Sequence, residues 1–278
     1  MVDHSLENPR VPSFLRLVIA VECTVVMAAA ILLFFLPGLA SDLWPWIIPP
    51  FNSRFVGAVY FAAYIPLILF WFLPRWIPGR LTLWLILTFT ATVLLVMLLH
   101  REVFEWNRPS TYLVYWPLYI FLPINAAVFL LKYKEEGAAN GYNGSATLRI
   151  VLWIFALLGA VYGLGLLIAP VALTAFWPWP VDAFHGRIYA AAFVTPAVGA
   201  WLLSRRRQSG VEYLSMGLNL AAGGLLPILG TLWTNTHVPA ERQVDFNSAG
   251  TWAFFMIFFL TGLLGIGLTV QARQLSER

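Results

Sequence analysis

Eight long runs of apolar residues, separated by short polar stretches, dominate the pattern of this chain. Each run is long enough to cross a hydrocarbon core of about 30 Å, which takes about 20 helical residues. The runs are continuous and do not alternate between apolar and polar positions, so they predict helices and not the strands of a membrane barrel. We therefore predict an all-α transmembrane fold of eight helices, at 15–39, 54–74, 81–100, 111–132, 148–172, 185–204, 211–234 and 250–271.

Composition and charge agree with a membrane protein. Hydrophobic residues make up 60% of the 278 residues and charged residues 11%, and the mean hydropathy is +0.77. Because cytoplasmic loops of membrane proteins are rich in Lys and Arg, both termini are predicted to be cytoplasmic, which puts 12 of the 17 basic residues inside. The net charge of +4 then reflects topology, and no nucleic-acid partner is predicted.

One short motif occurs twice. Trp44-Pro45-Trp46 is followed by Phe51 and Arg54, and Trp177-Pro178-Trp179 is followed at the same spacing by Phe184 and Arg187. We call a residue of the first half and a residue of the second half equivalent when their residue numbers differ by the same amount as those of Trp44 and Trp177. A motif repeated without a gap indicates that the chain is a duplicated unit. Since each half holds four spans, an even number, both halves enter the membrane from the same side. We predict two parallel four-helix repeats, related by an axis along the membrane normal.

The polar stretch at the midpoint predicts the boundary between the repeats. It carries charges and then a run rich in Gly, Asn and Ser, which is typical of a flexible linker. The predicted organisation is a first repeat at 1–133, a cytoplasmic linker at 134–147 and a second repeat at 148–278.

The two motifs supply the first candidate site. A guanidinium carries five donors in a planar fork, which suits a carboxylate or phosphate, so Arg54 and Arg187 are candidates for binding a small anion or a lipid headgroup. The alternative is structural: each arginine forms an ion pair close to its Trp-Pro-Trp motif, Arg54 with Glu105 and Arg187 with Asp245. The tryptophans either contribute to the same ligand site or form an interfacial belt; they are Trp44, Trp46, Trp177 and Trp179.

Glu22 is the acid that lies clearly within a predicted span, about two turns from its cytoplasmic edge. Carboxyl groups are costly in a membrane and often serve as proton or cation sites. Asn219, in another span, is a candidate partner. The residue equivalent to Glu22 is Phe155, so the duplication does not repeat this group. The alternatives are an intramembrane proton or ion site and a side chain that reaches the membrane surface or pairs with Arg16.

Histidines offer candidates for a metal or haem. His100, His185 and His237 all fall at the outer ends of spans, but their spacing matches no metal motif. The single cysteine, Cys23, allows no intrachain disulfide. We predict no cofactor, and a haem or redox protein is the third alternative. No catalytic motif is present, so an enzyme is not predicted.

The first half resembles a pattern found in uncharacterised bacterial multi-pass membrane proteins. The residues that carry the resemblance are the run from Trp44 through Arg54 to Gly57-Ala58, and His100-Arg101-Glu102 with the segment Phe104 to Ser110. The resemblance implies a bacterial plasma membrane and no particular activity.

Besides the haem or redox alternative, two functions stay open from the sequence. The first is a structural or accessory component, within the lipid bilayer or a larger membrane complex. The second is a transporter or binding protein for a small anion or lipid, with an outward-facing site between the repeats.

Overall fold

Eight helices in the described part of the chain are long and apolar enough to cross a membrane, which confirms the predicted transmembrane helices. The computed structural model describes residues 8–133, 144–205 and 209–276. Residues 134–143 of the predicted linker lie outside them. The spanning helices are α1 (Ser13–Phe35), α3 (Pro50–Phe72), α4 (Trp76–Leu99), α5 (Trp116–Lys132) with the π-helical turn Ser110–Tyr115 before it, α6 (Ala146–Ile168), α8 (Ala183–Arg205), α9 (Gly210–Asn235) and α10 (Ala249–Ser276).

Two spans end about one helical turn earlier than the hydropathy predicted. The predicted span 15–39 ends at Phe35, and a short helix, α2 (Pro37–Leu43), follows. The predicted span 148–172 ends at Ile168, and α7 (Pro170–Leu173) follows in the same way. Proline disfavours the helical conformation of the residue before it and fits the first turn of a new helix. Both breaks therefore arise at a proline, which the pattern of apolar residues alone does not reveal.

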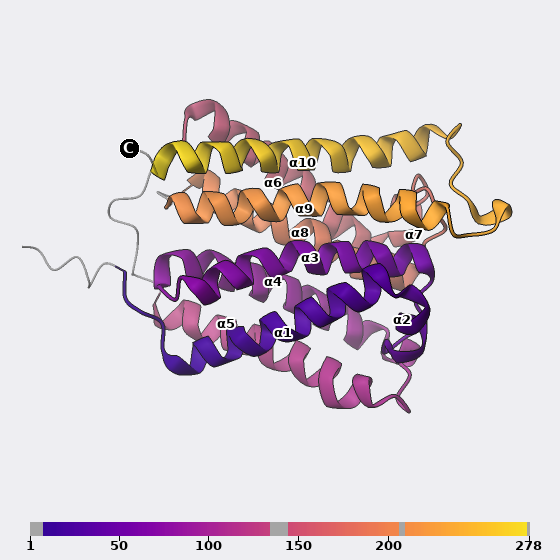
Figure 1. The fold of residues 1–278 in the computed structure, drawn as a ribbon, viewed down its shortest axis with the longest axis horizontal. Helices are drawn as coiled ribbons and strands as arrows, with labels where there is room; N and C mark the ends of the chain where they lie inside the picture. The colour runs from indigo at the N-terminus through magenta and orange to yellow at the C-terminus, as the bar shows by residue number, and fades with distance from the viewer. Residues whose placement is uncertain (1–7, 134–143, 206–208, 277–278) are drawn as a thin grey trace, which may run out of the picture.

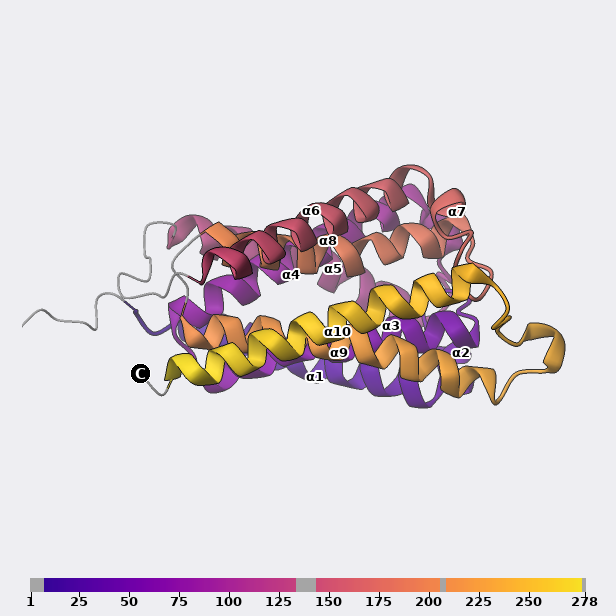
Figure 2. The ribbon, with the colours of Figure 1, turned by 90° about the horizontal axis from the view of Figure 1, so that it is seen from above.

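The long helices form two layers (Figures 1 and 2). Figure 2 shows α10, α9, α3 and α1 side by side in one layer and α6, α8, α4 and α5 in the other. Within each layer the neighbours in this order pack against one another. Each layer therefore contains helices from both halves of the sequence, and its centre is a contact between the halves: α3 with α9, and α4 with α8.

The short helices α2 and α7 lie at one end of the bundle, with the two Trp-Pro-Trp motifs (Figure 1). We call this the corner end. Helix α1 begins and α10 finishes at the opposite end. The corner end thus gathers four connections, and it is where the two halves contact each other through aromatic and arginine side chains.

Candidate functional site

Arg54 is buried at the corner end and all its described contacts are within the protein. It lies one turn inside α3, not at the start of the span as predicted, and is 5% exposed. Its Nε donates to the carbonyl of Phe34 at 3.1 Å, and its Nη1 donates to Thr234 Oγ1 at 3.0 Å. The guanidinium also lies 4.7 Å from the ring centre of Trp233, a favourable cation–π arrangement. Arg54 therefore joins α1, α3 and α9.

Arg187 repeats this arrangement on α8. Its Nε donates to the carbonyl of Leu167 at 3.0 Å, and its Nη1 contacts His100 Nε2 at 2.9 Å. Leu167 is equivalent to Phe34, and Trp233 is equivalent to His100. Equivalent arginines thus reach equivalent positions.

The predicted corner ion pairs are not formed. Among the described residues, neither Arg54 nor Arg187 pairs with a carboxylate, so the pairing with Glu105 and with Asp245 is wrong. The carbonyl oxygens at the ends of α1 and α6 provide acceptors instead, because the last carbonyls of a helix have no partner within the helix.

The tryptophans at the corner end cross between the halves. Trp46 Nε1 donates to His185 Nε2 at 3.3 Å, and Trp179 Nε1 donates to Asn52 Oδ1 at 2.7 Å. Their rings cross as well: Trp46 packs edge-on against Phe184 with ring centres 5.2 Å apart, and Trp179 stacks on Phe51 at 5.3 Å. Each contact made from one half has its counterpart between equivalent residues of the other.

The histidines have separate surroundings. His185 is buried, and its Nδ1 lies 2.5 Å from Asp182 Oδ2. Partial burial opposes ionisation of Asp182, but its hydrogen bonds and the charge of His185 outweigh this and lower its pKa to about 2. His100 contacts Arg187 and Glu102, whereas His237 contacts Thr236 and Trp233. No group of three His, Cys, Asp or Glu side chains among the described residues is placed to hold a metal.

A cavity of about 650 Å³ lies between α1, α3, α4 and α5, and we call it the first cavity. It runs from Asp42, Arg108 and Ser110 at the corner end to Glu22 in the middle of α1. Lining residues on α1 and the turn before α5, such as Thr24, Ala28 and Val114, are also exposed on the surface. The cavity is therefore open on the flank of the bundle between these two helices.

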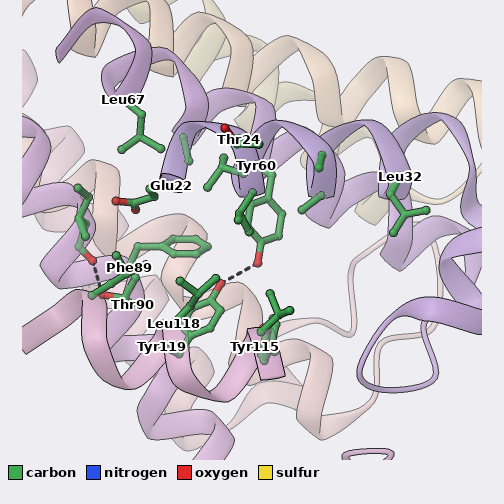
Figure 3. A pocket seen from close by; sticks show the side chains of 18 of the residues that line it. Glu22, Thr24, Leu32, Tyr60, Leu67, Phe89, Thr90, Tyr115, Leu118 and Tyr119 are labelled. Atoms are coloured by element: carbon green, nitrogen blue, oxygen red, sulfur yellow. Dashed lines mark hydrogen bonds between the residues drawn. The ribbon is translucent and has the colours of Figure 1, made fainter. Parts of the chain in front are cut away.

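Glu22 is 6% exposed, lines the first cavity, and has one carboxylate oxygen, Oε2, buried without a hydrogen-bond partner. Figure 3 shows Glu22 beside Phe89 and Thr90, with three tyrosines further along the wall. Tyr60 and Tyr119 share a hydrogen bond of 2.7 Å, and the ring of Tyr115 packs on that of Tyr119. The first cavity thus combines an apolar wall with a carboxyl group and a tyrosine cluster.

Asn219 also lines the first cavity, but its amide has a structural partner. Its Nδ2 donates to the carbonyl of Ala62 at 2.8 Å. Pro66, one turn further along α3, cannot donate to that carbonyl, so Asn219 satisfies an acceptor that the proline leaves free. Glu22 and Asn219, which the sequence suggested as partners, therefore line the same cavity, but the amide of Asn219 already donates to Ala62.

A second cavity of about 630 Å³ lies on the opposite flank, between α6, α8, α9 and α10. Phe155, the residue equivalent to Glu22, lines it, as do Phe193, Phe254 and Phe258. Phe193 is equivalent to Tyr60 in the first cavity. The two cavities meet at Ala63, Phe89, Thr195 and Asn219, which line both.

The first tryptophan of each motif shows a further difference between the cavities. Trp177 Nε1 donates to Tyr162 Oη at 2.9 Å. The residue equivalent to Tyr162 is Ala29, and Trp44 Nε1 is accordingly buried without a hydrogen-bond partner. Ala29 lines the first cavity, so the small side chain both widens the cavity and removes the partner of Trp44.

The tyrosine cluster and the role of Ala29 were not predicted from the sequence. Both are visible in the sequence as differences between the halves, but only the fold brings these positions to one wall. The structure also places Arg54 and Arg187 outside both cavities, away from Glu22 and Asn219.

Fold and site define a multi-pass integral membrane protein associated with the lipid bilayer. Comparisons with family models, with curated proteins and with solved structures gave no match. Function therefore has to be argued from the site itself.

Proposed function

We propose that this protein is a membrane-embedded binding protein or transporter for a small lipid-like molecule, which it holds in the first cavity. The observation that carries the proposal is a cavity of about 650 Å³ with a largely apolar wall and the buried, unpartnered Oε2 of Glu22. Ligand sites are typically concave and apolar, with a few placed polar groups. A carboxyl group at this depth is costly, and a bound ligand gives it a partner.

In this proposal the two arginines and the crossing tryptophans hold the halves together and do not bind the ligand. Two donors of each guanidinium are already directed at protein atoms. Arg54 is also buried, and neither arginine lines either cavity. The site therefore lies beside the corner, within the first half, and not between the corners.

We further propose that the molecule is a duplicated unit with two parallel repeats, in a bacterial plasma membrane with both termini cytoplasmic. The arginine and tryptophan contacts, which match between equivalent residues, support the duplication. The positions of the basic residues support the orientation. The corner end then faces outward, and the first cavity opens toward the outer leaflet.

A structural or accessory role is the second candidate. The arginine and tryptophan contacts at the corner end support it, because they hold the helices together at that end of the bundle. It does not explain, however, why Glu22 and Trp44 have buried polar atoms without hydrogen-bond partners in the first cavity, whereas the equivalent residues Phe155 and Trp177 do not. A ligand in the first cavity accounts for that difference.

Native mass spectrometry of the protein extracted from its own membrane tests the proposal. We expect a bound small molecule in the wild type and its loss in Ala29→Tyr, which places in the first cavity the side chain that the second cavity already holds as Tyr162. The matched control is Ala192→Phe, on the wall of the second cavity, which should keep the molecule. Equal retention in both variants, or an empty wild type with a stoichiometric partner protein, would contradict the proposal.

A further inference from the structure

We infer that the ligand of the first cavity is a lipophilic amine, whose ammonium group pairs with the carboxylate of Glu22. The inference rests on the proposed function and names its ligand class. It starts from Glu22, a side chain more than nine-tenths buried, on the cavity wall, with Oε2 free of any hydrogen bond.

The charges along the cavity favour a cation at Glu22. Its charged side chains are Glu22, Asp42 and Arg108. Arg108 is at the far, corner end, and its Nη1 donates to the carbonyls of Ser41 and Trp44. Glu22 thus has no basic side chain beside it on the wall of the described structure. An anionic ligand would be repelled there, and a neutral apolar ligand would leave the carboxyl group without a partner.

The rings near Glu22 also suit an ammonium group. Phe89, Tyr60 and Tyr119 lie on the walls that face Glu22 (Figure 3). Aromatic faces attract cations, more strongly when water is excluded. The second cavity has rings as well but Phe155 in place of Glu22, so the carboxyl group distinguishes the two.

The depth of Glu22 decides between a free amine and the headgroup of a bilayer lipid. Glu22 is near the middle of α1 (Ser13–Phe35), and a helix rises 1.5 Å per residue, so the carboxyl group lies about 14 Å along the axis from the start of the helix. A lipid headgroup stays at the membrane surface. The ammonium group that reaches Glu22 therefore belongs to a small amphiphile that enters the cavity through its open flank or the corner end.

Equilibrium binding of labelled decylammonium to the full-length protein in phosphatidylcholine nanodiscs tests the inference, with empty nanodiscs subtracted. Decanol and decanoate serve as neutral and anionic probes with the same chain. We expect one saturable site for decylammonium, with affinity about tenfold to a hundredfold above that for decanol, because a charge-assisted hydrogen bond is replaced by a neutral one. Glu22→Gln should remove this preference, whereas Phe155→Gln, the same amide in the other cavity, should keep it.

The outcomes separate the inference from the proposed function. Saturable binding of decylammonium and decanol with equal affinity, abolished by Ala29→Tyr and unchanged in Glu22→Gln, would overturn the amine but keep the ligand cavity. Absence of saturable binding for all three probes would overturn both. Adding an aminophospholipid to the nanodiscs tests the headgroup alternative: we expect no competition with decylammonium, and strong competition would show that the ammonium comes from a lipid.

Discussion

The two cavities lie at equivalent places on opposite flanks of one bundle, yet their walls differ. The arginine of each half makes the same backbone contact at the corner end, Arg54 Nε with the Phe34 carbonyl and Arg187 Nε with the Leu167 carbonyl. The first cavity is lined by Glu22 and Tyr60, and the second is lined by Phe155 and Phe193 at the equivalent positions. The shared contacts indicate what the fold requires, and the differences indicate where one half has acquired a separate role.

Three pairs of positions carry the difference. Glu22 is equivalent to Phe155, Tyr60 to Phe193 and Ala29 to Tyr162. Two of these changes place polar groups in the first cavity, and the third makes room and leaves Trp44 Nε1 without a partner. Unpaired buried polar groups destabilise a protein. Among the described residues, Glu22 and Trp44 carry such groups whereas the equivalent Phe155 and Trp177 do not, and this difference points to a ligand that uses them.

The largest expected effect concerns the shared frame. Arg54→Ala removes two charge-assisted hydrogen bonds and leaves the Phe34 carbonyl and Thr234 without their donor, so we expect the free energy of unfolding to fall by about 4 kcal/mol. Arg187→Ala, at a half-buried corner, should cost less. Unfolding titrations in mixed micelles measure both. If either variant is as stable as the wild type but loses ligand, the arginine is a binding residue and our structural assignment is wrong.

Opening the second cavity should be the next most costly change. Tyr162→Ala removes a large, partly buried side chain and deprives Trp177 Nε1 of its acceptor, so we expect a loss of about 3 kcal/mol. Tyr162→Phe keeps the ring and isolates the hydrogen bond, with an expected loss of about 1 kcal/mol. The same unfolding titration compares the two. Equal losses of unfolding free energy in the two variants would mean that the hydroxyl of Tyr162, and not the space filled by its ring, accounts for its contribution to stability.

The reverse change in the first cavity should stabilise the protein. Ala29→Tyr fills part of the cavity and offers Trp44 Nε1 an acceptor, as in the other half, so unfolding should require about 1 to 2 kcal/mol more. Ala29→Phe serves as the control that fills space without an acceptor. A tyrosine variant less stable than the phenylalanine variant would show that Trp44 and Trp177 are not in equivalent surroundings.

The smallest expected effect is a pH dependence at the corner of the second half. Partial burial alone would raise the pKa of Asp182, but His185 and neighbouring backbone N–H groups lower it to about 2 in the folded protein. A lowered carboxyl pKa stabilises the fold above its unfolded value of about 4, and that contribution is lost as the pH falls toward 2. After allowance for solvent screening we expect about 1 kcal/mol. Asp182→Asn should abolish this part of the pH dependence; an unchanged profile would contradict it.

Much of the fold followed from the sequence because lipid imposes simple rules. Eight apolar runs predicted the eight spans, and Pro37 and Pro170 explain why two of the spans end earlier than their apolar runs. The repeated motif located the corners. It did not reveal the partners of Arg54 and Arg187, since these are backbone carbonyls and residues distant in sequence, which leave no local signal.

The candidate site was harder to predict for a similar reason. Glu22 was identifiable as an acid in an apolar run, but its cavity depends on Tyr60, Tyr115 and Tyr119 from other helices. Tyrosine is common in membrane proteins, and none of these positions stands out when taken alone. Only the packing of α1, α3, α4 and α5 shows that these groups share one wall with the carboxyl group.

The most direct test of the central claim is to find where a ligand binds. The probe is a decylamine that carries a photoreactive diazirine in its chain. When it is activated in nanodiscs that contain the wild-type protein, it labels the residues around it. Peptide mass spectrometry then locates the labelled residues. We predict labels on α1 and on α5 and the turn before it, around the first cavity, and their loss with excess decylammonium. Labels on α6 and α10, or labels spread evenly over the lipid-facing helices, would contradict the account.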